Sequence, residues 1–137
     1  MENSLDFAAL RQFIVSHVEN FEQLEALLLL RRHRQSLSAA VVASELKIDT
    51  HQTSQALRAL VTSNLVAVDD SSPVKTFRYS PASADLSQGV DLLAAAYDEH
   101  RVKVVQLMSR NALDRARTIA LRNFADGFRL GGPKKNG

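Results

Sequence analysis

Cysteine is absent from the 137 residues of the chain. Its absence excludes thiol catalysis, disulfide bonds and every metal site that uses cysteine ligands. A chain without disulfides also suits a reducing compartment. Other residue types must therefore distinguish the function classes that remain.

Long apolar segments are missing too. The leucine-rich block Ala26–Leu30, for example, is flanked by Glu25 and Arg31, and it is much shorter than the roughly 20 residues of a membrane-spanning helix. The first twenty residues hold one arginine against three acidic residues, unlike the basic start of a signal peptide. The sequence therefore predicts a cytoplasmic protein with no membrane partner.

The motifs of common enzyme classes are also missing. The sequence has no glycine-rich phosphate loop, no Gly-x-Ser-x-Gly and no His-Glu-x-x-His pattern around Glu99 and His100. The histidines are too scattered to show a metal-ligand spacing, at positions His17, His33, His51 and His100. We expect His17, Tyr97 and Phe124 to be packing residues, and we predict a protein that is not an enzyme and needs no cofactor or metal.

The charges that are present nearly balance. Seventeen lysines and arginines face fifteen acidic residues, which gives a net charge of +2 and a pI near 9.2. Residues 21–63 carry five cations against four acids, and residues 64–84 carry two of each. A surface that attracts phosphate must therefore come from folding, which can gather the cations on one face.

The N-terminal third reads as two helices. Apolar residues recur at spacings of three and four over residues 5–18, where Ser4 is the expected N-cap. Asn20 is expected to cap the second helix, with Gln23 completing a capping box. This helix ends in a basic run at Arg31, Arg32, His33 and Arg34. The helix dipole accounts for cations there, and contact with phosphate is the alternative.

Two shorter helices joined by a tight turn are predicted next. Ser38 is expected to cap a helix over residues 39–46. Asp49 is expected to cap a second helix over residues 50–63. Lys47 and Ile48 form the turn between them. The second helix has an inward stripe formed by Thr53, Ala56, Leu57 and Leu60. This arrangement is typical of a helix-turn-helix.

The periodicity changes after Asn64. Residues 65–68 are β-prone, residues 69–73 form a polar turn, and residues 75–79 alternate with Phe77 and Tyr79 on one face. Strand, turn and strand make a hairpin. Its position directly after the helix-turn-helix is that of a wing.

Helical periodicity returns at Asp85 and continues to Met108. We expect Asn111 to begin a further helix, Gly127 to end it and residues 131–137 to form a disordered tail. The long apolar stripe of these helices requires a partner, which a second copy would supply. An intramolecular bundle that buries the whole stripe is the alternative.

Residues 24–80 resemble the winged-helix DNA-binding domains of bacterial regulators. The resemblance is carried by "ASELKIDTHQTSQALRALVTSNLV" and by the returning strand "KTFRYSP". Helices on both sides of this module are similar to the MarR-like class, whose members are homodimers joined by their outer helices. The stretch "YDEHRVKVVQLMSRNALDRARTIALRNFADGFRL" also looks like the end of small uncharacterised bacterial winged-helix proteins.

The resemblance implies a mainly α fold with a small β-hairpin, a winged helix-turn-helix with flanking N- and C-terminal helices. Its parts would be an N-terminal helix at 1–20, the winged domain at 21–82, dimerisation helices at 85–130 and the tail. One departure concerns the wing. The class usually carries Asp-x-Arg at the wing tip, whereas Asp69 and Asp70 are followed here by Ser71 and Ser72.

The expected function is a homodimeric transcriptional regulator that binds double-stranded DNA. The second helix of such a motif lies in the major groove, where glutamine can pair with adenine and arginine with guanine. The outward side chains that suit this task are Thr50, His51, Gln52, Ser54, Gln55 and Arg58. Phosphate contacts are expected from Lys47, Lys75 and Arg78.

The alternative is a winged helix that docks on a transcription or signalling protein without reading DNA, since a fold does not fix a function. The nearly neutral module and the acidic wing tip favour this alternative. The distribution of charge beside residues 50–63 separates the two hypotheses. A face dominated by Lys47, Arg58, Lys75 and Arg78 would favour DNA, and one dominated by Glu45, Asp49, Asp69 and Asp70 would favour a protein partner.

Overall fold

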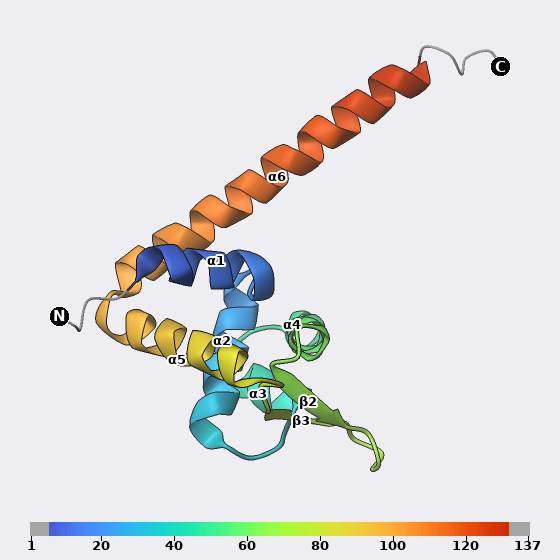
Figure 1. Cartoon of the computed structure of the whole chain (residues 1–137). Helices are drawn as coiled ribbons and strands as arrows, with labels where there is room; N and C mark the ends of the chain where they lie inside the picture. Colours follow the sequence, from blue (N-terminus) through green and yellow to red (C-terminus); the bar gives the residue numbers. More distant parts are fainter. Residues whose placement is uncertain (1–5, 132–137) are drawn as a thin grey trace.

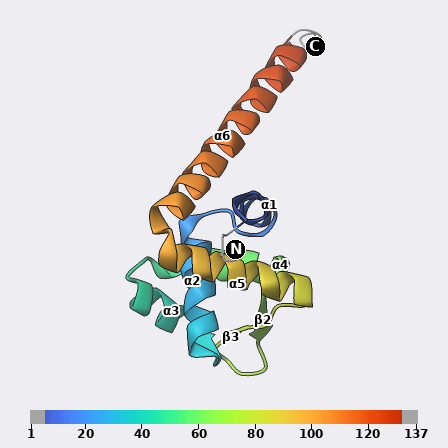
Figure 2. The same cartoon turned by 60° about the vertical axis from the view of Figure 1, so that its left-hand side comes forward.

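The chain folds into a helical domain with a small sheet, from which one long helix projects (Figures 1 and 2). The computed structural model describes residues 6–131. The helices are α1 (Phe7–His17), α2 (Phe21–His33), α3 (Ala39–Leu46), α4 (Thr50–Thr62), α5 (Ala84–Glu99) and α6 (Arg101–Gly131). The strands are β1 (Leu37–Ser38), β2 (Val66–Asp69) and β3 (Thr76–Tyr79).

Side-chain caps begin most of the helices. The predicted caps Asn20, Ser38 and Asp49 are confirmed, since their side chains accept the backbone N–H groups of Gln23, Val41 and Gln52 at 2.9, 3.2 and 3.0 Å. The first helix begins later than predicted because Asp6 caps it, accepting from the Ala9 N–H at 3.1 Å. The expected cap, Ser4, lies outside the described residues. Each such cap contributes about 1 kcal/mol to helix stability.

The helix-turn-helix is formed by α3 and α4. Lys47 adopts a left-handed conformation with φ 60°, which ends α3 and reverses the chain. Asp49 then starts α4, and the predicted inward stripe is buried: Thr53, Ala56, Leu57 and Leu60. The Thr53 hydroxyl donates to the Asp49 carbonyl at 2.9 Å, so this buried polar group is satisfied.

The sheet has three antiparallel strands in the order β1-β3-β2. The predicted hairpin is confirmed as β2 and β3, with Val68 opposite Phe77. The short strand β1 was not predicted, because a two-residue strand has no periodicity of its own. It forms only when the chain before α3 meets the free edge of β3, which pairs Leu37 with Phe77.

The core is organised around α2, which packs against α3, α4 and β3. Its side chains are buried nearly all round, including the fully buried Leu24, Leu27 and Leu30. The apolar stretch Ala26–Leu30 is buried on successive positions around the helix, which is typical of a helix in the interior. This central position fixes α4 on the sheet and leaves its opposite face in solvent (Figure 1).

The C-terminal helices differ from the prediction. The helix ends at His100, which has φ −136° and ψ 52°, and not near Met108. The next helix, α6, then runs without interruption through Asn111, its predicted start, and through Gly127, its predicted end. One tertiary contact lies at this break: the ring centroids of Phe7 and His100 are 5.6 Å apart in an edge-on arrangement. Across the break, the Arg101 guanidinium lies 4.3 Å from the Tyr97 ring centroid, four residues earlier in the chain. One helical glycine costs only about 1 kcal/mol, which is too little to end α6 at Gly127.

The outer half of α6 is exposed. Phe124 is 68% exposed and not a core residue, so the prediction that it packs in the interior was wrong, whereas Tyr97 is buried as expected. Of the segment predicted to be a disordered tail, Gly131 is helical, and residues 132–137 lie outside the described part. No helix among the described residues is long and apolar enough to cross a membrane.

Candidate nucleic-acid interface

The solvent face of α4 carries the side chains predicted to read DNA. Burial of its opposite stripe against α2 and α3 fixes the rotation of the helix. As a result the outward residues are exposed, with Ser54 half-buried at the edge: Thr50, His51, Gln52, Ser54, Gln55 and Arg58. The helix therefore presents a polar, hydrogen-bonding surface on a rigid support.

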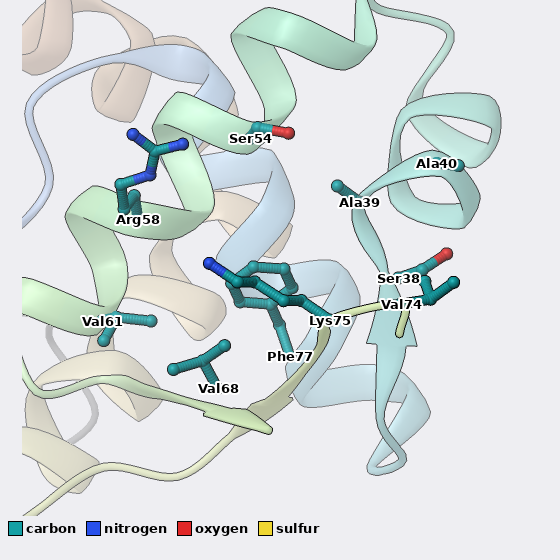
Figure 3. Close-up of a pocket in the computed structure, with 10 residues that line it drawn as sticks. All are labelled: Ser38, Ala39, Ala40, Ser54, Arg58, Val61, Val68, Val74, Lys75 and Phe77. Carbon is teal, nitrogen blue, oxygen red and sulfur yellow. The ribbon is translucent and has the colours of Figure 1, made fainter. Parts of the chain in front are cut away.

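Two of the predicted cations meet in one groove beside this face. Arg58 from α4 and Lys75, just before β3, line a groove of about 300 Å³ together with residues of α3 and of both hairpin strands (Figure 3). In this view the Lys75 amine points from the hairpin toward the α4 side. Within residues 6–127, neither cation has a carboxylate at ion-pair distance. Both charges are therefore available to an anion.

Arg78 is separated from these two cations. It alternates with Phe77 along β3 and lies in a different depression, lined also by Ser36, Ala67 and Asp69. Lys47 is exposed in the turn that precedes α4. The structure thus gathers Arg58 and Lys75, keeps Lys47 near the start of α4, and directs Arg78 to the other face of the sheet.

The turn of the hairpin is acidic. Asp69 accepts hydrogen bonds from the Ser71 hydroxyl at 2.7 Å and the Ser71 N–H at 3.0 Å. These bonds lower the pKa of the Asp69 carboxyl, because they stabilise its charged form. Together with Asp70, this carboxylate keeps the tip of the hairpin negative at neutral pH.

One member of the basic run at the end of α2, Arg31, is paired within the fold. The Arg31 guanidinium forms an ion pair with Asp91 of α5 at 2.9 Å. Nearby, the Tyr97 hydroxyl donates to Glu25 at 2.6 Å. Burial, followed by this bond to Glu25, raises the pKa of Tyr97 to about 12. These contacts tie α5 to α2, so Arg31 has a structural role that does not require phosphate.

The groove also contains apolar residues that were not predicted as part of a site. Val61, Val68, Val74 and Phe77 line it between Arg58 and Lys75. The alternation of the hairpin predicted the inward position of Phe77, but a groove depends on the spacing between α4 and the sheet. Among the described residues, no group of three histidine or acidic side chains could hold a metal ion.

Comparison with known proteins identifies the fold. No protein-family model matches the chain, and no curated protein matches it. Among solved structures, it is similar to a homodimeric winged helix-turn-helix DNA-binding domain from Mycobacterium bovis, a possible ArsR-family regulator. The two are 23% identical with a TM-score of 0.51, over 73% of this chain and 93% of that one. The chain has the winged helix-turn-helix fold.

Two further structures agree with this fold. The adhesin competence repressor of Streptococcus pyogenes is 18% identical with a TM-score of 0.50, over 85% of this chain and 83% of that one. A mutant of S. aureus MepR bound to an oligodeoxyribonucleotide is 18% identical with a TM-score of 0.51, over 88% of each chain. In the winged-helix fold, α3 and α4 are the helix-turn-helix, and β2 and β3 are the wing.

The projecting part of α6 is a second candidate surface. Its base is anchored, since Val104, Leu107 and Met108 are buried and Arg115 donates to the Glu19 carbonyl at 3.0 Å. Beyond Arg115 the described side chains are all exposed. Apolar side chains remain in contact with solvent there and just before it, at Leu113, Ile119, Leu121 and Phe124.

Proposed function

We propose that this protein is a DNA-binding transcriptional regulator that acts as a homodimer, with α4 in the major groove. The observation that carries the proposal is the polar outer face of α4, bordered by Arg58 and Lys75 without acidic partners. A recognition helix in this fold enters the major groove with its N-terminal half toward the bases.

The chemistry of α4 supports base reading. Gln52 and Gln55 lie on the exposed face of its N-terminal half, and glutamine pairs bidentately with adenine. Arg58, one turn further on, can pair bidentately with guanine or contact phosphate. Lys47, in the turn before α4, and Lys75, in the groove beside it, would then contact the DNA backbone and orient the domain.

The homodimer rests on α6. A helix whose outer half exposes Leu113, Leu121 and Phe124 leaves apolar surface that a second copy can cover. A two-fold dimer would place two copies of α4 on related half-sites. Helices on both sides of the winged domain and this mode of pairing are the plan of the MarR-like class.

Fluorescence anisotropy with fragmented genomic DNA tests DNA binding. We expect saturable binding at low salt, and log K should fall with log salt at a slope of roughly −3 per protomer if Lys47, Arg58 and Lys75 each neutralise one phosphate. R58Q should weaken binding at least tenfold. R32Q is the matched control, because Arg32 is exposed at the far end of α2. Absence of saturable binding would refute the proposal.

A second function is favoured by the hairpin. Its acidic tip, with the ionised Asp69 beside Asp70, would repel phosphate and suits a basic protein surface. The winged domain would then dock on a transcription or signalling protein. Affinity purification tests this function. It would be supported if the protein does not bind DNA, retains a stoichiometric protein partner, and loses that partner in the variant D69N/D70N.

A further inference from the structure

The two sides of α4 differ in charge. On the side of the wing, Arg58 and Lys75 are the only charged residues that line the groove. On the opposite side, a depression of about 360 Å³ lies between α4 and the start of α2, and its only charged lining residues are Glu19 and Glu22. We call these two carboxylates the anionic flank. The helix expected to read DNA therefore lies between charges of opposite sign.

The backbone of the loop between α1 and α2 holds Glu19 beside α4. Its N–H donates to the Gln23 side chain at 2.8 Å, and its carbonyl accepts from the Arg115 side chain of α6 at 3.0 Å. Gln23 is buried, so the first of these bonds belongs to the core. Glu22 lies in the first turn of α2, where the helix dipole favours an acidic residue. Both residues of the anionic flank are therefore anchored by the fold.

The charges of the anionic flank are not neutralised within the fold. Among residues 6–127, no basic side chain lies at ion-pair distance from Glu19 or Glu22. Glu19 is exposed and Glu22 is half-buried. The same depression is lined by Gln52 and Gln55, the side chains expected to pair with adenine. A phosphate on this side of α4 would meet two uncompensated negative charges.

We propose that Glu19 and Glu22 are specificity-determining residues that keep DNA phosphate away from one side of α4. Attraction at Arg58 and Lys75 and repulsion at the anionic flank favour the same orientation of the duplex. Duplexes that cannot be read in this orientation would gain little from the phosphate attraction that drives non-specific binding. This inference rests on the proposed function, because it names residues that restrict DNA binding.

Two DNA probes test this repulsion. One is a duplex that the wild type selects from a random-sequence library, and the other is the unselected library. In E19Q/E22Q, affinity for the library should rise about five- to tenfold at about 50 mM salt, whereas affinity for the selected duplex should change less than about twofold. The specificity ratio would therefore fall. The gain should shrink at about 200 mM salt, because salt screens exposed charges.

D85N/E99Q is the matched control. It removes two carboxylates from exposed positions at the two ends of α5, and neither residue lines a depression beside α4. The net charge changes by the same amount, so both affinities should stay within about twofold of the wild type. Equal gains in the two variants would overturn the proposal. Weaker binding of the selected duplex by E19Q/E22Q would also overturn it, because the carboxylates would then accept hydrogen bonds from bases such as cytosine.

A heparin column separates this proposal from the proposed function. Heparin is a polyanion without bases, so its retention reports charge alone. E19Q/E22Q should elute at higher salt than D85N/E99Q. This result in a protein that ignores DNA would keep the repulsion at the anionic flank and refute the proposed function. Saturable DNA binding by the wild type, with identical elution of the two variants and unchanged library affinity, would keep the proposed function and overturn the repulsion.

Discussion

At the scale of single residues, Gly89 of α5 lies directly against Phe13 of α1. A Cβ atom at this position would overlap the ring of Phe13, which itself packs against His17 at 5.0 Å. Overpacking typically costs 1–3 kcal/mol, more than the roughly 1 kcal/mol that alanine gains over glycine in a helix. We predict that G89A lowers the free energy of unfolding, measured with urea at fixed protein concentration.

Gly127 is the matched control for this substitution. It also lies within a helix, but a Cβ there would meet nothing within 4 Å. G127A should therefore raise the stability of α6 by up to about 1 kcal/mol. Equal effects of the two substitutions would contradict the close approach of α1 and α5.

Tyr97 gives a prediction about pH. Its pKa is raised from 10.0 to about 12, first by burial and then by the hydrogen bond to Glu25. A raised pKa means that the folded state favours the neutral phenol. The stabilisation is therefore complete below pH 10 and is lost as the pH rises toward 12.

Ultraviolet absorbance of tyrosinate checks this value. In Y79F, which leaves Tyr97 as the single tyrosine, we expect a titration midpoint near 12. Adding E25Q should move the midpoint part of the way toward 10, because burial remains as the larger cause. A midpoint near 10 in Y79F itself would contradict the burial of Tyr97 and its hydrogen bond to Glu25.

At the scale of elements, α4 is capped by a residue, Asp49, whose charge would oppose the proposed DNA binding. Asp49 caps α4 through the Gln52 N–H, but its carboxylate lies at the end of the helix that would face phosphate. Serine caps nearly as well without the charge. We predict that D49S keeps the stability within about 0.5 kcal/mol and raises DNA affinity several-fold, measured by anisotropy at low salt.

D49A is the control for the cap. It removes the same charge but leaves the first turn of α4 without its side-chain acceptor, so it should cost about 1 kcal/mol of stability. If D49S and D49A destabilise the protein equally, the cap has no role. If D49S weakens DNA binding, the N-terminus of α4 does not approach phosphate.

At the scale of the whole molecule, the projecting half of α6 bears on the oligomeric state, because its apolar side chains are exposed in a single chain. If the proposed homodimer forms through α6, L113E/L121E should shift it to a monomer in sedimentation experiments, because both side chains are more than 60% exposed in one chain and a dimer would bury them. R122E changes the charge at an exposed position on the other side of the same helix from Leu113 and should leave the dimer intact. A wild-type monomer at micromolar concentration would contradict the homodimer.

The sequence determined the elements of the winged domain by local rules. Asn20, Ser38 and Asp49 accept the N–H groups that a helix start leaves free, and the stripe from Thr53 to Leu60 follows the helical period. These signals act between residues that are neighbours in the chain. The hairpin was predictable for the same reason, because alternation toward Phe77 is a local pattern.

Tertiary structure decided what depends on distant residues. The strand β1 forms because Leu37 pairs with Phe77, and the helix break at His100 lies where the Phe7 ring of α1 packs against His100. The groove joins Arg58 to Lys75, which are seventeen positions apart (75 − 58), and excludes Arg78. Side chains from separate elements meet only when the core fixes their spacing, and no local pattern encodes that spacing.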